Sequence, residues 1–188
     1  LLGEYYEDGV FGNGPNIKKA EFYFKRAYSN ENKENNYSPI YSANHYARIL
    51  LNTGKNNLAK KVLLNALKKN KGQNPNEVGY SNYLLGFNLF SSDNAKDENE
   101  CIKYFVKSFQ AFEKDKEFFF ETFKKILELV NHNLNLAKKI PERFFDYIAN
   151  TNFLEKNFSK EERSELEDLL LLFLKQETNK NKKSYKKT

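Results

Sequence analysis

The chain has 188 residues, of which 39% are hydrophobic, 15% aromatic and 30% charged, with a net charge of +6. Large apolar side chains at this frequency can build a hydrophobic core, which excludes a wholly disordered chain. The single cysteine, Cys101, excludes an intrachain disulfide, and no run of about eighteen apolar residues is present that could span a membrane.

Apolar residues recur at three- and four-residue spacing along most of the chain, which is typical of amphipathic helices. The predicted helices cover residues 1–8, 16–29, 40–53, 56–70, 79–91, 97–113, 116–132, 142–150 and 160–175. Ser159 and Glu162 have the spacing of a capping box at the start of the last helix. No alternating segment is long enough to predict a strand, so the expected fold class is all-α.

Small residues return at a fixed distance along these helices. Ala20, Ala59 and Cys101 are separated by 39 and 42 residues, and Ala27, Ala66 and Ser108 repeat the same two spacings. Neighbouring helices approach to about 8–10 Å only where small side chains lie at the crossing. The positions that we assign to helix packing or to turns are Gly3, Gly9, Ala20, Ala27, Ala47, Gly54, Ala59, Ala66, Gly86, Cys101 and Ser108.

The first unit reads Leu2-Gly3-x-x-Tyr6-x-x-Gly9, followed by Lys19-Ala20-x-x-Tyr23-Phe24-x-Arg26-Ala27. It resembles a Sel-1-like repeat, a branch of the tetratricopeptide superfamily, with Tyr23 where the family usually has Trp. The second unit resembles a plain tetratricopeptide repeat, and the third is degenerate. The resemblance implies an α/α superhelical solenoid of helix hairpins, with repeats at about 1–36, 37–76 and 77–113. A degenerate repeat and capping helices are expected over 114–175.

Members of this superfamily act mostly as scaffolds or adaptors without catalytic activity. The resemblance therefore implies that a protein partner binds in the concave groove formed by the first helix of each repeat. The family's groove positions map to Glu4, Glu7, Asp8, Tyr41, Asn44, Arg48, Asn52, Tyr80, Tyr83, Phe87 and Phe90. This surface runs from acidic to aromatic, so we expect a partner segment with Lys or Arg toward the first repeat and apolar residues toward the third.

One binding mode of the superfamily does not fit the sequence. Some members hold a C-terminal carboxylate with Asn, Lys and Arg side chains. Glu4 stands where the first Asn of that clamp would be, and Tyr80 where a Lys would be. An acidic side chain repels a carboxylate, so a clamp of this kind is not expected.

Signals for catalysis or cofactors are weak. His45 and His132 lack a partner at metal-ligand spacing, and Cys101 occupies an alanine position. The glycines of Gly9-x-x-Gly12-x-Gly14 lack the Lys-Ser/Thr of a P-loop and follow no strand. We therefore expect no enzyme, no metal and no cofactor. A different class remains open, namely a bacterial immunity-type inhibitor that plugs the active site of a toxin enzyme.

The positive charge lies at the end of the chain. From Lys175 onward there are six lysines and one acid, which leaves 25 basic and 24 acidic side chains before it, a net charge of +1. Residues 176–188 are therefore expected to form a disordered basic tail. Binding of this tail to RNA or an anionic membrane is a further alternative, although no specific nucleic acid is predicted. The chain opens on Leu1 without a methionine, so we expect a fragment of a longer protein, and its compartment is not predicted.

Overall fold

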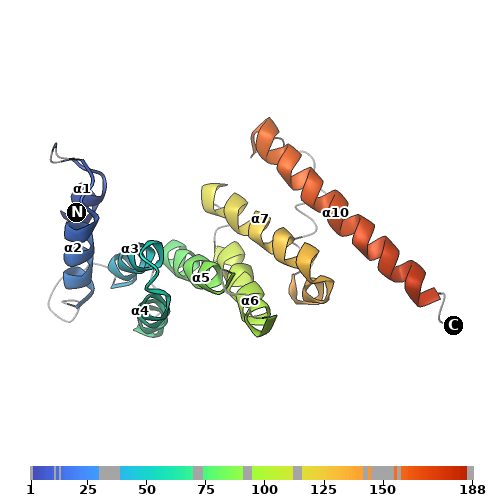
Figure 1. Ribbon diagram of the computed structural model, residues 1–188, viewed down its shortest axis with the longest axis horizontal. Coiled ribbons are helices and arrows are strands. Elements are labelled where there is room, and N and C mark those ends of the chain that lie inside the picture. The colour runs from blue at the N-terminus through green and yellow to red at the C-terminus, as the bar shows by residue number, and fades with distance from the viewer. Residues whose placement is uncertain are drawn as a thin grey trace. The chain divides into compact units, whose positions relative to one another are not determined.

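A computed structural model describes residues 2–10, 12, 14–29, 39–69, 74–90, 95–111, 116–141, 144, 155 and 158–185. All regular secondary structure in these ranges is helical, and neighbouring helices pack on one another (Figure 1). The prediction of an all-α fold is therefore confirmed. The predicted helix at 142–150 lies outside the described residues except for Phe144.

The chain divides into two units, residues 1–91 and 92–188. This boundary falls inside the predicted third repeat, 77–113, whose two helices belong to different units. The pairing of those two helices as a hairpin therefore stays a prediction. The first unit contains the two other predicted hairpins and the first helix of the third.

Five helices follow one another in the first unit. They are α1 (Leu2–Glu7), α2 (Ile17–Ser29), α3 (Pro39–Asn52), α4 (Asn56–Lys69) and α5 (Pro75–Phe90). Each helix packs against the next one along the chain, and α3 also packs against α5. Helix α5 begins four residues earlier than predicted, because Asn74 caps it (Glu77 N to Asn74 Oδ1, 3.4 Å) and proline is favourable in the first turn of a helix.

The small residues of the first unit lie mostly where close packing requires them. Ala20, Ala47, Ala59 and Ala66 are fully buried. Ala27 is exposed, so its assignment to a helix-packing position is wrong. The buried face of α2 runs through Ala20 and Phe24, and the next contact on that side comes from the ring of Tyr28, whose centroid lies 6.3 Å from that of Tyr46.

Glycine is required at a close contact between two helices and at the turns that follow helices. A side chain at Gly3 would meet the ring of Phe24, because an added Cβ would lie 2.8 Å from three ring atoms. Helix α1 therefore approaches α2 closely only with glycine at this position. Gly9 and Gly54 follow α1 and α3 with φ angles of 72° and 73°, a region that residues with a side chain rarely adopt. These two glycines form the turns that the sequence predicted between paired helices.

The second unit is built from α6 (Ala95–Ala111), α7 (Lys116–His132), the 3₁₀ helix η1 (Leu134–Lys139) and α10 (Lys160–Tyr185). Helix α7 packs against α6, η1 and α10. Phenylalanines fill its centre, since the ring centroids of Phe123 and Phe144 are 4.4 Å apart and Phe109 lies 5.2 Å from Phe144. Cys101 and Ser108 are fully buried, as their small-residue positions predict, and Ser108 Oγ lies 3.2 Å from Thr122 Oγ1.

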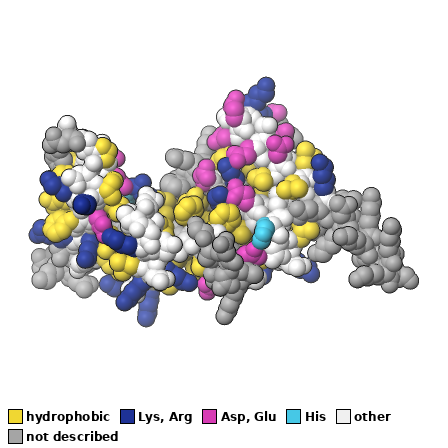
Figure 2. Space-filling model, viewed as in Figure 1, with side chains coloured by type: hydrophobic (Ala, Val, Ile, Leu, Met, Phe, Trp, Pro, Cys, Tyr) yellow, Lys and Arg dark blue, Asp and Glu magenta, His cyan; other side chains and the backbone are white. Residues whose placement is uncertain are grey.

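Helix α10 begins with the predicted capping box. Glu162 N donates to Ser159 Oγ at 3.1 Å, and Ser159 N donates to Glu162 Oε2 at 2.7 Å. The helix continues to Tyr185, ten residues beyond its predicted end at 175, so the expected disordered tail begins inside it. Its last part contains neither glycine nor proline and includes lysine, glutamine and glutamate, which are good helix formers. Acidic side chains gather over the start of this helix (Figure 2).

None of the described helices combines the length and the low polarity that crossing a lipid bilayer requires.

Candidate interaction surface

The surface predicted to bind a partner lies on α1, α3 and α5, which are called the first helices below. Four of the predicted partner-binding residues connect α1 to α3 by a hydrogen bond and an ion pair. Tyr41 on α3 donates a hydrogen bond from its hydroxyl to Glu4 Oε1 on α1. Arg48 Nη2 lies 2.6 Å from Glu7 Oε2, and the Glu7 side chain is only 16% exposed. These four side chains therefore hold two helices together, in addition to any role toward a partner.

His45 lies at the centre of this contact. Its ring is stacked on Phe24 of α2, with centroids 4.7 Å apart, and its centroid lies 4.5 Å from that of Tyr41. Its Nδ1 lies 3.5 Å from Glu7 Oε2 and 3.4 Å from Arg48 Nη2. Burial, and then the nearby Arg48 charge, lower the pKa of His45 below 6.5 even though Glu7 opposes the shift. A neutral imidazole between two aromatic rings is typical of a residue that packs helices together.

The carboxylate of Glu4 is stabilised in its ionised form. The hydrogen bond from the Tyr41 hydroxyl is the largest cause that lowers the pKa of Glu4 below 4.5, and partial burial opposes it. A carboxylate that already accepts this bond offers fewer lone pairs to a cation on a partner. Glu4 therefore keeps its negative charge, but one acceptor position of its carboxylate is used within the molecule.

Asn44 does not face a partner. Its side chain is fully buried, and its Nδ2 donates to Glu77 Oε2 at 2.8 Å and to the Glu77 carbonyl at 2.9 Å. Its Oδ1 accepts a hydrogen bond of 2.5 Å from Ser81 Oγ on α5. The assignment of Asn44 to the partner-binding surface is therefore corrected, because its polar atoms are used in packing α3 against α5.

Glu77 and Ser81 belong to this contact and were not predicted. A signal was present in the sequence, since Asn44 follows Ile40 by four residues and directly neighbours Ala43 on the apolar side of the helix. A polar residue on an apolar helix face is buried only with a hydrogen-bond partner. The sequence of α3 does not say where along the chain that partner lies.

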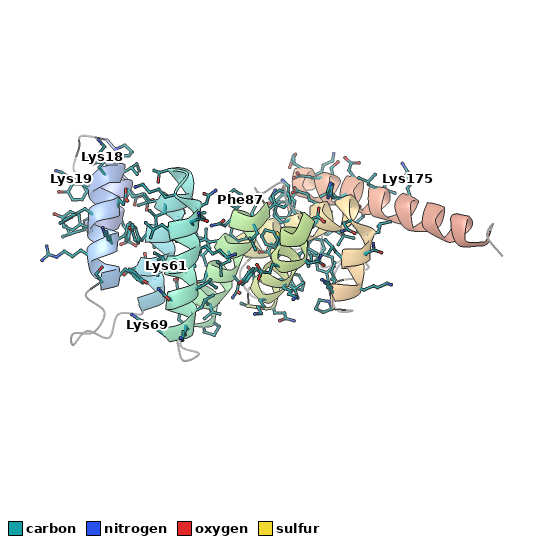
Figure 3. All side chains as sticks on the ribbon, turned by 60° about the horizontal axis from the view of Figure 1, so that its bottom comes forward. Lys18, Lys19, Lys61, Lys69, Phe87 and Lys175 are labelled. Atoms are coloured by element: carbon teal, nitrogen blue, oxygen red, sulfur yellow. The ribbon has the colours of Figure 1, made fainter. Side chains whose placement is uncertain are left out.

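An aromatic row runs along α5. Tyr80, Tyr83, Phe87 and Phe90 are spaced by three, four and three residues, so they lie on one side of the helix. Ring centroids are 6.4 Å apart both for Tyr80 with Tyr83 and for Tyr83 with Phe87. Phe87, labelled in Figure 3, is 38% exposed and Phe90 is 37% exposed. At 3.6 residues per turn, Tyr83 and Phe90 point roughly opposite to Ser81, which faces α3.

The remaining predicted residues, Asp8 and Asn52, are exposed. The other helices of the first unit have a basic outer face. Helix α4 contains four lysines and no acid, and Lys61 and Lys69 are exposed, as are Lys18 and Lys19 of α2 (Figure 3). The first unit therefore presents the exposed acid Asp8 directly after α1, aromatic rings on α5 and lysines on α2 and α4.

Among the described residues, no three His, Cys, Asp or Glu side chains come together in a way that could hold a metal ion. His132 pairs with Glu98, with its Nδ1 at 2.7 Å from Oε1, and it lies in the second unit whereas His45 lies in the first. Cys101 is buried as a free thiol.

No family model, curated protein or solved structure matches this chain. The resemblance to Sel-1-like and tetratricopeptide repeats therefore stays a prediction that depends on the residues quoted above.

Proposed function

We propose that this chain is a non-catalytic protein–protein interaction scaffold of the Sel-1-like or tetratricopeptide type, in which helix hairpins stack as a solenoid. The successive packing of α1 to α5 supports this architecture. Burial of Ala20, Ala47, Ala59 and Ala66 supports it further, because small residues at repeated positions are what stacked hairpins require.

The observation that carries the proposal is the aromatic row of α5. Tyr and Phe side chains are enriched at protein interfaces because each buries a large apolar area with little loss of conformational freedom. Phe87 and Phe90 still have more than a third of their surface exposed to solvent. A partner that covers this surface gains the hydrophobic contribution of both rings, so these two residues are the proposed anchors.

The acidic residues of the first predicted repeat indicate the charge that a partner would carry there. Asp8 is exposed beside α1, whereas Glu4 and Glu7 are engaged by Tyr41 and Arg48. A partner with a basic residue toward α1 and apolar residues toward α5 is therefore favoured, with the apolar contact contributing most of the affinity. Exposed ion pairs add only about 0.2–1 kcal/mol each.

Fluorescence anisotropy with synthetic peptides tests this function. A peptide with Lys or Arg followed by Leu and Phe is expected to bind, and a peptide that ends in an acidic tail is expected not to. Replacing Phe87 and Phe90 together by alanine is expected to weaken binding about tenfold or more. Phe22→Ala is the matched control, since Phe22 lies on α2, is 58% exposed and is not part of the row.

Two results would reject the proposal. One is a preference for the acidic peptide, and the other is equal binding by the double variant and the wild type. Circular dichroism of each variant shows whether its helices are retained, so that a loss of binding is assigned to the surface and not to unfolding.

A further inference from the structure

Helix α10 has a solvent-facing side that its contacts within the second unit do not use. On the inner side, Leu166 is fully buried, and Asn131 Nδ2 of α7 donates to the carbonyl of Leu169 at 2.9 Å. On the outer side, two adjacent leucines remain exposed, Leu171 at 52% and Leu172 at 45%. The two leucines lie halfway along a 26-residue helix and form a small apolar surface on its outer side.

Along the outer side of α10, the charged residues are acidic before Leu171 and Leu172 and basic after them. Glu161, Asp168, Lys175 and Lys182 are separated by seven residues each, which is close to two full turns of a helix, so all four positions lie on one side of α10. The two acids precede the leucines and the two lysines follow them. Glu161, Asp168 and Lys175 are exposed, and Figure 3 shows Lys175 projecting outward from the helix.

The pattern is symmetric about the leucine pair. Asp168 comes three residues before Leu171, and Lys175 comes three residues after Leu172. Glu161 comes ten residues before Leu171, and Lys182 comes ten residues after Leu172. A second copy of α10 laid antiparallel, with its leucines against these leucines, therefore has Lys175 level with Asp168 and position 182 level with Glu161. By the two-fold symmetry each of these pairs occurs twice.

We propose that α10 is a dimerisation helix, which pairs antiparallel with α10 of a second copy of this chain across Leu171 and Leu172. This inference is independent of the partner-binding surface on the first unit.

The charges on α10 favour a second copy of this chain as the partner and an antiparallel orientation of the two helices. Within the part of the chain that the structure describes, Glu161, Asp168 and Lys175 make no ion pair, so their charges are available to another molecule. A parallel pair would bring Asp168 against Asp168 and Lys175 against Lys175, which is repulsive. An anionic membrane would be repelled by Glu161 and Asp168 on the same side of the helix.

Sedimentation velocity of the full chain over a wide concentration range tests the proposal. The wild type is expected to show a reversible monomer–dimer equilibrium that weakens as salt is added, since exposed charge pairs are screened. Asp168→Lys and Lys175→Asp are each expected to raise the dissociation constant about tenfold or more, because each change turns two attractive contacts into two repulsive ones.

The doubly substituted chain gives the sharpest result. Asp168→Lys combined with Lys175→Asp restores opposite charges across an antiparallel pair, so dimerisation is expected to return toward the wild-type level. Lys138→Asp, on an exposed position of η1 in the same unit, is the matched control and is expected to dimerise as the wild type does. Circular dichroism of each single variant shows whether its helices are retained.

The proposal is overturned if the wild type is monomeric at every concentration or if the single charge variants dimerise normally. A double variant that fails to recover also overturns it. A monomeric wild type that sediments with vesicles of phosphatidylserine and phosphatidylcholine would replace the dimer with a membrane-surface role for this helix.

Discussion

Arg48 on α3 forms an ion pair with Glu7 on α1, with Nη2 and Oε2 2.6 Å apart. The two residues are 41 positions apart in the chain, so the pair connects the first helices of two predicted repeats. The same contact contains His45 and, through Tyr41, Glu4. The polar residues of this region thus contribute to the association of α1 with the rest of the first unit, and this leads to a set of stability predictions.

Glu7→Gln is expected to lower the free energy of unfolding by about 1 kcal/mol, because it removes a charge-assisted contact that is mostly shielded from water. Urea unfolding followed by circular dichroism measures the change. Asp8→Asn is the matched control, since Asp8 is exposed, and it is expected to stay within about 0.5 kcal/mol of the wild type. Equal effects of the two changes would contradict a stabilising role for the Glu7–Arg48 pair.

His45 makes the stability depend on pH. Burial lowers its pKa below 6.5 in the folded chain, so below that pH the unfolded chain binds a proton that the folded chain excludes. The free energy of unfolding is therefore expected to fall as the pH drops below 6.5, whereas above it this contribution is fully present. Urea unfolding between about pH 8 and pH 5 measures the slope.

The variant that tests this dependence is His45→Gln, which removes the titrating group. Its unfolding free energy is expected to change less with pH in this range than that of the wild type. Asn52→Gln, at the exposed end of the same helix, serves as the control and keeps the wild-type slope. A His45→Gln slope equal to that of the wild type would show that His45 does not titrate differently on folding.

Asn44→Ala is expected to cost about 1–3 kcal/mol, because it leaves the buried Ser81 hydroxyl and the Glu77 carboxylate without a hydrogen-bond partner. Asn52→Ala makes the same chemical change on the exposed part of α3 and is expected to cost about 0.5 kcal/mol or less. The midpoint of urea unfolding compares the two. If Asn44 faced a partner and not α5, both variants would be about equally stable.

Gly3→Ala is expected to destabilise the chain by about 1–3 kcal/mol, because the new methyl group would lie 2.8 Å from the ring of Phe24. Phe24→Leu creates room at this place, so the cost of Gly3→Ala is expected to be smaller in the Phe24→Leu background than in the wild type. A double-mutant cycle by thermal or urea unfolding measures this coupling. Strict additivity would mean that the two residues are not in contact.

The helices themselves could be predicted well. Helix α7 has its predicted bounds, and the capping box of Ser159 and Glu162 forms as its spacing indicated. Helix α10 is longer than predicted, because a polar, lysine-rich composition is compatible with a helix when the stretch contains good helix formers. These features depend on residues within one or two turns of each other, which is why a local pattern is sufficient to recognise them.

The candidate surface could be predicted only in part. Its residues lie on the first helices except for Asp8, which directly follows α1, and the aromatic row of α5 follows from the spacing of Tyr80, Tyr83, Phe87 and Phe90. Asn44 and Asn52 stand on the same helix and have the same side chain, yet one is buried and the other is exposed. The difference arises from Glu77 and Ser81, which are more than thirty positions away from Asn44.

The amino-acid sequence alone thus determined the helical character of the chain, the turns at Gly9 and Gly54 and most of the small residues at helix contacts. Each of these is set by backbone conformation or side-chain size at its own position. The tertiary structure alone decided which polar side chains pair inside the molecule, such as Glu7 with Arg48, and which charges are left on the outside of α10. A hydrogen bond or ion pair between distant segments forms only when folding brings both partners together, and periodicity within one helix carries no information about the other.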